Sequence, residues 1–258
     1  MKKSDFETDF QNNPLSFATS DEKKTYKELK RHLLEDTIEI SGDFWNWPLV
    51  SYLTIPSIQR LLHINHIYDL QLGQTGSIME FGVHYGSTMI QLMNMRAIKE
   101  PYNYSRHIYG FDTFEGFDET TTHDAFAKEG DYFVAKNYEK TLEDLCILHE
   151  RLAPKNQINK STILKGDASV SLENLLTERK DIMISMALFD LDLYKPTKDV
   201  LELLIPRLHK GSVLVFDELN CPEYPGETEA LREVLDLNKF ELKKSPFLPF
   251  SSILLWNI

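Results

Sequence analysis

Short apolar runs alternate with helix-period segments over most of the chain, starting near residue 77. The runs predict strands at 77–83, 107–113, 162–166, 182–191 and 212–216, with helices at 87–98, 138–152, 171–179, 197–208 and 226–237. Two further strands, at 240–244 and 252–256, are joined by a proline-containing turn and predict a hairpin. Five β-α units followed by a hairpin predict a doubly wound, seven-stranded, Rossmann-like α/β sheet with an antiparallel C-terminal hairpin.

The first 70 residues follow a different pattern and predict a helical extension. Residues 1–20 are polar and aperiodic, which indicates an arm or a frayed end. An amphipathic helix is predicted from Ser20, its expected N-cap, to Asp36, and a second helix begins near Pro56. The aromatic segment 44–48 either holds these helices to the core or forms a wall or lid over a substrate or subunit interface. We therefore expect an N-terminal extension over 1–70 and a main domain over 71–258.

The charge balance excludes some classes of partner. The 258 residues include 40 acidic and 28 basic side chains, a net charge of −12, and such a surface repels nucleic acid. No apolar run reaches the roughly 20 residues that span a membrane, and the first residues lack the apolar stretch of a secretory signal. Cys146 and Cys221 match no metal-ligand spacing. We expect a cytoplasmic protein with two reduced thiols.

The ends of the first three strands carry the residues of a nucleoside site. Ligands of doubly wound sheets bind beyond the carboxyl ends of the strands. Gly82 and Gly86 follow the first strand and allow a tight turn close to a ligand. Asp112 ends the second strand, where a carboxylate can accept hydrogen bonds from ribose hydroxyls, and Asp167 follows the third, where it can reach an adenine amine. Three acids or glycine turns at consecutive strand ends favour a nucleoside site over solvated strand ends.

The next two strands end in further acids. Asp190 follows the fourth strand, and Asp217 and Glu218 follow the fifth. Neighbouring parallel strands would bring these carboxylates to one rim, where they repel each other unless a cation or protons compensate. Mg²⁺ or Ca²⁺ prefers such oxygen ligands. The alternative is that the three acids point apart into water.

At these residues the sequence resembles the macrocin O-methyltransferase family, the TylF-type methyltransferases. The matching segments are EFGVHYGST (80–88), FDTFEGF (111–117), GDA (166–168), DLDLYKPTKDVLELLIPRL (190–208) and VLVFDE (213–218). The resemblance implies the methyltransferase version of the doubly wound sheet, and a metal-dependent transfer from S-adenosylmethionine to a sugar hydroxyl of a natural product. One departure is that Glu218 stands where the family usually shows a second aspartate.

The resemblance also implies roles for individual residues. The cofactor would be held by Glu80, Gly82, Gly86, Ser87, Asp112, Asp167 and Ala168. The divalent cation, Mg²⁺ or another such as Ca²⁺, would be bound by Asp190, Asp217 and Glu218.

For the base that takes the hydroxyl proton, Asp190 is the first choice and His123 the second. His123 lies in a long loop, 118–134, that is a candidate lid. The expected partner is a small-molecule acceptor, a sugar or glycoside, and self-association into a homo-oligomer remains open.

Three alternatives are weighed against this assignment. A catechol-type metal-dependent O-methyltransferase would differ only in its acceptor site, which the sequence does not specify. A nicotinamide-dependent oxidoreductase would need a Gly-x-Gly-x-x-Gly turn, which positions 82–87 (GVHYGS) do not provide. A non-catalytic scaffold would have no need to gather mutually repelling carboxylates.

Overall fold

The computed structural model of the protein describes residues 19–117, 120–124 and 127–257. The chain divides into two compact units, one ending at Arg60 and the other spanning Leu61–Ile258. The division falls within helix α4 (Ile55–Gln71), earlier than the boundary predicted between residues 70 and 71. That predicted boundary of the two functional parts stays a prediction. The N-terminal arm predicted for residues 1–20 lies almost entirely outside the described residues.

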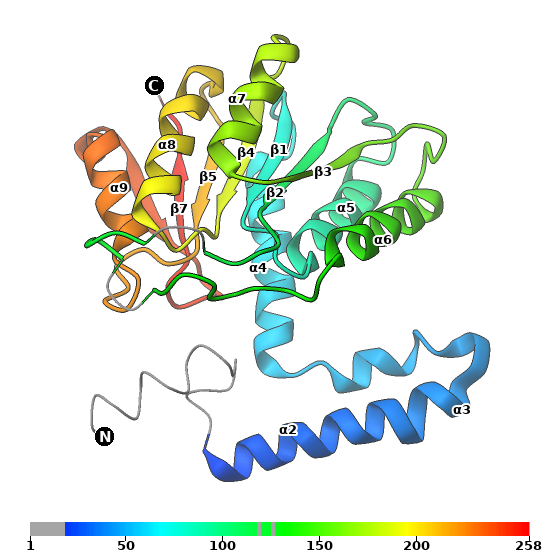
Figure 1. Cartoon of the computed structure of the whole chain (residues 1–258). Coiled ribbons are helices and arrows are strands. Elements are labelled where there is room, and N and C mark those ends of the chain that lie inside the picture. Colours follow the sequence, from blue (N-terminus) through cyan, green and yellow to red (C-terminus); the bar gives the residue numbers. More distant parts are fainter. Residues whose placement is uncertain (1–18, 118–119, 125–126, 258) are drawn as a thin grey trace. The chain divides into compact units, whose positions relative to one another are not determined.

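A seven-stranded sheet in the order β3-β2-β1-β4-β5-β7-β6 forms the centre of the second unit (Figure 1). Its strands are β1 (Ser77–Phe81), β2 (Ile108–Asp112), β3 (Ser161–Lys165), β4 (Ile184–Phe189), β5 (Val213–Phe216), β6 (Glu241–Lys244) and β7 (Ser252–Leu255). The first five strands are parallel, whereas β7 pairs antiparallel with both β5 and β6. The predicted fold class, including the antiparallel C-terminal hairpin, is confirmed.

Helices cover both faces of this sheet. One buried cluster packs α7 (Ala168–Glu178), α8 (Tyr194–Leu204) and α9 (Gly226–Val234) against one face. A second cluster packs the C-terminal part of α4 with α5 (Ser87–Lys99) and α6 (Tyr138–Leu152) against the other. The separation of α7 and α8 from α5 and α6 is visible in Figure 1. Strands buried on both faces are continuous apolar runs, which is why their positions were evident in the sequence.

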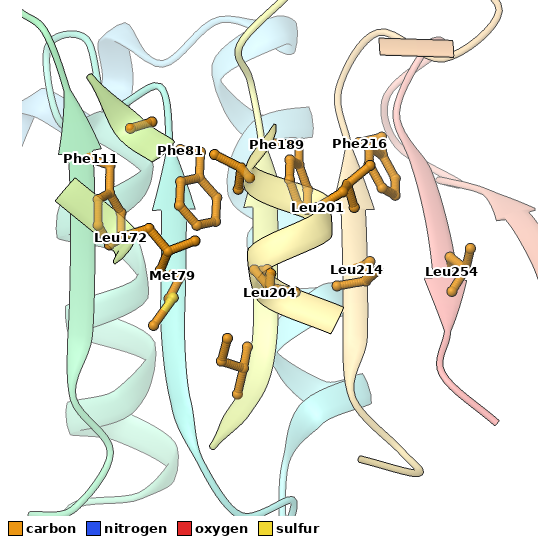
Figure 2. Close-up of a cluster of buried hydrophobic side chains, with 14 of the residues drawn as sticks. Met79, Phe81, Phe111, Leu172, Phe189, Leu201, Leu204, Leu214, Phe216 and Leu254 are labelled. Carbon is orange, nitrogen blue, oxygen red and sulfur yellow. The ribbon is translucent and has the colours of Figure 1, made fainter. Parts of the chain in front are cut away.

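Four phenylalanines form a row across neighbouring strands near their carboxyl ends (Figure 2). Ring centroids lie 4.7 Å apart for Phe81 and Phe111, 5.3 Å for Phe81 and Phe189, and 4.7 Å for Phe189 and Phe216. All four are buried, with at most 1% of their surface exposed. The residues that follow them in the chain are Gly82, Asp112, Asp190 and Asp217. This apolar row therefore places the four candidate site residues side by side at the same edge of the sheet.

The N-terminal unit begins with helix α2 (Ser20–Leu33), and Thr19 rather than Ser20 is its N-cap. The Glu22 amide donates to Thr19 Oγ1 at 3.3 Å, while Glu22 Oε2 accepts from the Thr19 amide at 2.7 Å. Threonine followed three residues later by glutamate is the sequence pattern of a capping box. The prediction of Ser20 as N-cap did not take this pattern into account. Leu34–Ile38 continue the helix as a wider π-helical turn.

The aromatic segment 44–48 joins two short 3₁₀ turns in this unit, η2 (Gly42–Phe44) and η3 (Pro48–Tyr52). The rings of Phe44 and Trp47 contact each other edge to face, with centroids 6.1 Å apart. This contact is local, so the choice between a packing role and a lid stays open.

Other element boundaries differ from the prediction by a few residues. Helix α7 begins at Ala168 rather than 171 because Asp167 caps it, and α8 begins at Tyr194 rather than 197. Pro196 lies in the first turn of α8, where proline is tolerated because the amides there have no intrahelical acceptor.

Among the described residues, none of the helices has both the length and the apolar character needed to cross a bilayer. Both cysteines are buried free thiols.

Candidate active site

The turn after β1 brings the backbone against the end of β4. Gly82 has a φ of 89°, and a Cβ placed on it would lie 1.8 Å from the carbonyl oxygen of Asp190. The Gly82 amide donates to the Phe111 carbonyl at 2.9 Å, and the Asp190 amide donates to the Phe81 carbonyl at 2.9 Å. Gly86, at φ 77°, directly precedes α5, which begins at Ser87. Gly82 therefore permits a close approach to the backbone of Asp190, the first candidate base, while the predicted approach of this turn to a ligand stays a prediction.

Asp112 connects the ends of β1 and β2. Its Oδ2 accepts a hydrogen bond from the His84 amide at 2.7 Å, and its Oδ1 accepts one from the Phe114 amide at 2.6 Å. A carboxylate held by two amides is fixed in direction, and each oxygen retains a second lone pair. The structure thus brings Asp112 beside the glycine turn, as a nucleoside site requires. Its contact with a ribose stays a prediction.

The other predicted cofactor residues lie on neighbouring elements. Asp167 caps α7, with its Oδ1 accepting from Ser169 Oγ at 2.6 Å and from the Val170 amide at 2.9 Å. Burial acts to raise the pKa of Asp167, but these hydrogen bonds outweigh it and the pKa falls below its usual value. Ala168 begins α7, and Glu80 is buried within β1 between β2 and β4. These positions surround the carboxyl ends of β1 to β3, and contact with a cofactor remains a prediction for each.

The acids after β4 and β5 lie at adjacent strand ends. Phe189 and Phe216 are register partners, so Asp190 and Asp217 follow paired positions. The Asp217 amide donates to the Phe189 carbonyl at 3.0 Å, which continues the ladder past the last strand residues. Burial and the neighbouring charge of Asp217 raise the pKa of Glu218. The predicted trio is therefore gathered at one edge of the sheet.

Asp192 is close enough to this group to interact with the charge of each of its members, although it was not among the predicted site residues. It is 7% exposed and has a positive φ of 60°. Burial raises its pKa well above the usual value, and the charges of Asp190, Glu218, Glu227 and Asp217 raise it further. Five carboxylates thus share one electrostatic environment.

A metal ion is the usual solution to such crowding, and the donors here are the oxygens that Mg²⁺ and Ca²⁺ prefer. Within residues 19–117, 120–124 and 127–257, no three acidic, histidine or cysteine side chains have an arrangement that could hold a metal ion. The type of donor thus suits a hard cation, but the arrangement of these side chains in the described residues does not form a metal site, and the cation stays a prediction.

Glu227 is the second residue that the sequence interpretation missed. It lies in the first turn of α9 and is fully buried. Its Oε1 accepts from the Leu191 amide at 3.1 Å, and its Oε2 accepts from the Glu218 amide at 3.4 Å. Burial, followed by the charges of the neighbouring acids, raises its pKa well above the usual value, although the hydrogen bond from Leu191 opposes the shift. The sequence pattern that could have identified Glu227 is an acid in the first turn of α9, the next helix after β5.

The second candidate base, His123, contacts helices α8 and α9. Its ring stacks on Tyr194 with centroids 4.3 Å apart, and its Nδ1 is paired with the Glu229 carboxylate. The loop that carries His123 also contacts the start of α8. Buried Asp124 accepts hydrogen bonds from the Tyr194 amide at 2.7 Å and, within the loop, from the Thr121 amide at 2.6 Å. A role of His123 as base stays a prediction, as does a lid function for loop 118–134, parts of which lie outside the described residues.

Aromatic side chains lie between the glycine turn and the acids. The ring of Tyr132 is 6.2 Å from that of His84 and 5.2 Å from that of Phe117, and its hydroxyl is 3.3 Å from that of Tyr224. Burial raises the pKa of Tyr132, and the charge of Asp192 raises it further. Tyr132 therefore lies close enough to both groups to contact a molecule bound between them.

Comparisons with known proteins agree with this arrangement. The sequence model of the family described as macrocin O-methyltransferase (TylF) matches residues 2–239. A crystal structure of CalS11, a calicheamicin methyltransferase, is 34% identical, with a TM-score of 0.88 over 93% of this chain and 94% of that one. The apo structure of CalS11, described as a TDP-rhamnose 3'-O-methyltransferase, is 33% identical, with a TM-score of 0.81 over 93% and 96%.

A structure of the O-methyltransferase NovP shares the fold at 18% identity, with a TM-score of 0.58 over 78% of this chain and 81% of that one. No curated protein sequence gives a significant match. The family match covers most of the chain, and it coincides with the glycine turn and the acidic strand ends described above. The protein is therefore an O-methyltransferase and belongs to the macrocin O-methyltransferase (TylF) family.

Proposed function

We propose that this enzyme transfers the methyl group of S-adenosylmethionine to a hydroxyl of a sugar or glycosylated natural product, with a divalent cation beside the acceptor. The observation that carries the proposal is the contact between Gly82 and the Asp190 carbonyl, which joins the predicted cofactor turn to the acidic group. The CalS11 structures support the acceptor class, because one of them is described as acting on a TDP-linked sugar.

The cofactor would lie along the ends of β1 to β3. The α5 N-terminus at Ser87 offers amide donors there, and the carboxylate of Asp112 is already directed by two amides. When bound, S-adenosylmethionine supplies a methyl group on a positively charged sulfur. Glu80, Gly82, Gly86, Asp167 and Ala168 would complete this side.

The cation would be held by Asp190, Asp217 and Glu218, whose oxygens match its preference. When bound, a divalent cation lowers the pKa of a coordinated hydroxyl. Asp190 would accept the hydroxyl proton because its backbone lies directly against the glycine turn, between the two halves of the site. Transfer of the methyl group to the acceptor oxygen would break the carbon–sulfur bond, and the electron pair of that bond would remain on sulfur.

The acceptor would lie against the Tyr132 ring and the Tyr224 hydroxyl. Rings of this kind pack against the apolar face of a sugar, while their hydroxyls bond to its polar edge.

The decisive experiment follows transfer from S-adenosylmethionine carrying a labelled methyl group. Nucleotide-linked sugars, glycosides and catechols should be compared as acceptors, each with Mg²⁺, with a chelator, and with Mg²⁺ restored after chelation. We expect labelled product from a sugar-bearing acceptor only when the cation is present. Turnover of catechols alone would contradict the acceptor class, and chelator-resistant turnover would contradict the role of the cation.

A further inference from the structure

Helix α8 receives its side-chain cap from a loop far away in the chain. Leu193 stands at the N-cap position of α8, and leucine has no polar atom that could accept a hydrogen bond. The Tyr194 amide, the first of the helix, donates instead to Asp124 Oδ1 at 2.7 Å. A carboxylate at this end of a helix is also favoured by the helix dipole. The loop after β2 therefore supplies the cap that the local sequence of α8 does not.

The carboxylate of Asp124 is held in place for this contact. The residue is only 1% exposed, and its Oδ2 accepts from the Thr121 amide at 2.6 Å and from the Thr121 hydroxyl at 2.7 Å. A Cβ on Gly226, the first residue of α9, would lie 2.6 Å from Asp124 Oδ1 and 2.5 Å from the Tyr194 nitrogen. Glycine is therefore the residue that leaves room for the contact. The loop, α8 and α9 thus meet at this one hydrogen bond.

The contact fixes one end of a strained turn. Residues 190–193, which we call the β4–α8 turn, join β4 to α8. Within the turn Asp192 has a φ of 60°, which residues other than glycine adopt only at an energetic cost. Strain of this kind persists only where the surroundings hold the backbone in place. The Asp190 amide holds the near end of the turn by donating to a carbonyl of β1 at 2.9 Å, and Asp124 holds the far end.

A cap with a purely local task would not need a distant partner, because an aspartate or serine at the N-cap position would serve α8 equally well. Asp124 lies 70 positions before Tyr194 in the chain. What it adds is a fixed location for the start of α8, and therefore for the far end of the β4–α8 turn. The near end carries Asp190, whose carbonyl oxygen would be 1.8 Å from a Cβ on Gly82. A shift of Tyr194 would be passed through this short turn to Asp190.

We propose that Asp124 is a positioning residue for methyl transfer, which keeps the β4–α8 turn in the conformation that holds Asp190 beside the glycine turn. It acts through the Tyr194 amide, and both of its carboxylate oxygens already accept hydrogen bonds from the protein. This inference rests on the proposed function, because it presupposes that Asp190 takes part in the reaction. It does not require a cation at Asp190.

The test substitutes Asp124→Ala and follows transfer from S-adenosylmethionine with a labelled methyl group. The acceptor is the nucleotide-linked sugar or glycoside that the wild-type protein methylates fastest. We expect kcat to fall by about 10- to 100-fold, since a displacement of about 1 Å at a catalytic group has an effect of this size. The affinity for S-adenosylmethionine, measured by calorimetry, should be unchanged because its predicted site lies at β1 to β3. Hydrogen exchange at the Tyr194 amide should become faster.

Loss of a helix cap should lower the melting temperature of Asp124→Ala by only about 2–6 °C. The ring of His123 stacks on that of Tyr194 independently of Asp124, so the loop keeps a second contact with α8. If Asp124→Ala does not fold, Asp124→Leu replaces it, because leucine has the same number of side-chain heavy atoms but no acceptor.

Two variants serve as matched controls. Thr121→Ala removes the hydroxyl that donates to Asp124 Oδ2 and leaves the contact between Asp124 and the Tyr194 amide in place. It should keep the wild-type kcat. Asp124→Asn retains one side-chain oxygen that can accept from the Tyr194 amide, so it should recover most of the kcat that Asp124→Ala loses.

The outcomes separate the inference from the proposed function. If Asp190→Asn is inactive but folded Asp124→Ala keeps the wild-type kcat with saturating cofactor and acceptor, the positioning role is wrong and the function stands. The same conclusion follows if Asp124→Ala loses only stability and S-adenosylmethionine affinity, or if Thr121→Ala lowers kcat as much as Asp124→Ala does. If Asp190→Asn is fully active, the role of Asp190 in the proposed function and the inference both fail.

Discussion

Substitution of Gly82 by alanine tests whether the contact between the cofactor turn and the acidic group controls catalysis. The added methyl group would lie 1.8 Å from the Asp190 carbonyl oxygen, a separation that nonbonded atoms do not reach. Neither partner can move freely, because the amides of Gly82 and Asp190 both donate to carbonyls of neighbouring strands at 2.9 Å. The strand end must therefore deform, and Asp190 must move with it.

The loss of folding stability in Gly82→Ala has two parts, backbone strain and overpacking. Alanine at a φ near 90° costs about 1–2 kcal/mol of backbone strain, and forced overpacking adds about 1–3 kcal/mol. The variant Gly73→Ala should show the backbone strain without overpacking, since Gly73 has a φ of 85° and nothing lies within 4 Å of the added Cβ. For a domain of this size 1 kcal/mol shifts the melting temperature by about 2–4 °C. Gly73→Ala should thus lower it by about 5 °C, and Gly82→Ala by about 10 °C.

The effect on turnover separates the two variants more sharply. Relieving the clash requires a movement of roughly 1 Å, and a displacement of that size costs about 100-fold in rate when it moves a catalytic group. We expect kcat to fall by about that factor in Gly82→Ala and to stay at the wild-type value in Gly73→Ala, measured with saturating cofactor and acceptor. Equal melting temperatures and equal kcat values in the two variants would refute the reasoning.

Four further substitutions test the two halves of the site and the pH response. Asp190→Asn and Asp217→Asn should each abolish methyl transfer while calorimetry shows nearly unchanged S-adenosylmethionine binding; full activity in either variant would remove the argument for the cation. Asp112→Ala should weaken S-adenosylmethionine binding by about 10- to 100-fold, since a hydrogen bond to a charged group contributes about 1.5–3 kcal/mol; unchanged affinity would contradict the ribose assignment. Burial and the charge of Arg96 lower the pKa of His107 to about 4, below its unfolded value of about 6.5. The contribution of His107 to stability should therefore be constant above pH 6.5 and be lost as the pH falls from 6.5 to 4. Urea unfolding of His107→Gln, measured over this range, should lack that loss.

The fold could be predicted from the sequence because its central strands, β1, β2, β4 and β5, are buried along almost their whole length. Continuous apolar runs and the helices between them gave the number, order and type of the main elements, and the glycine turn and acids followed from where the runs stopped. The row of four phenylalanines shows why this worked. Phe81, Phe111, Phe189 and Phe216 each stand directly before a candidate site residue, so the packing pattern and the site share the same register.

The contacts that the sequence did not reveal join residues far apart in the chain. Glu227 meets Leu191 across 36 positions, and Asp124 meets Tyr194 across 70. Each is an acid in a polar segment, where a solvated side chain is the ordinary expectation. Their burial follows from the way α9 and the loop after β2 pack on the segment after β4, which no local pattern encodes. The error at Thr19 was different, because its capping box was visible in the sequence.

The acids at the carboxyl end of the sheet fall into two electrostatic groups, and their difference constrains the chemistry. Asp112 and Asp167 each accept two hydrogen bonds from nearby donors, so their negative charge is stabilised by the protein itself. Asp192, Glu218 and Glu227 instead have raised pKa values, caused first by burial and then by the charges of neighbouring acids. The two positively charged groups of the proposed reaction, a sulfonium and a divalent cation, would suit this division. Asp192→Asn removes one acid whose pKa is raised by its neighbours, and should therefore raise the melting temperature of the cation-free protein while weakening its stabilisation by Mg²⁺.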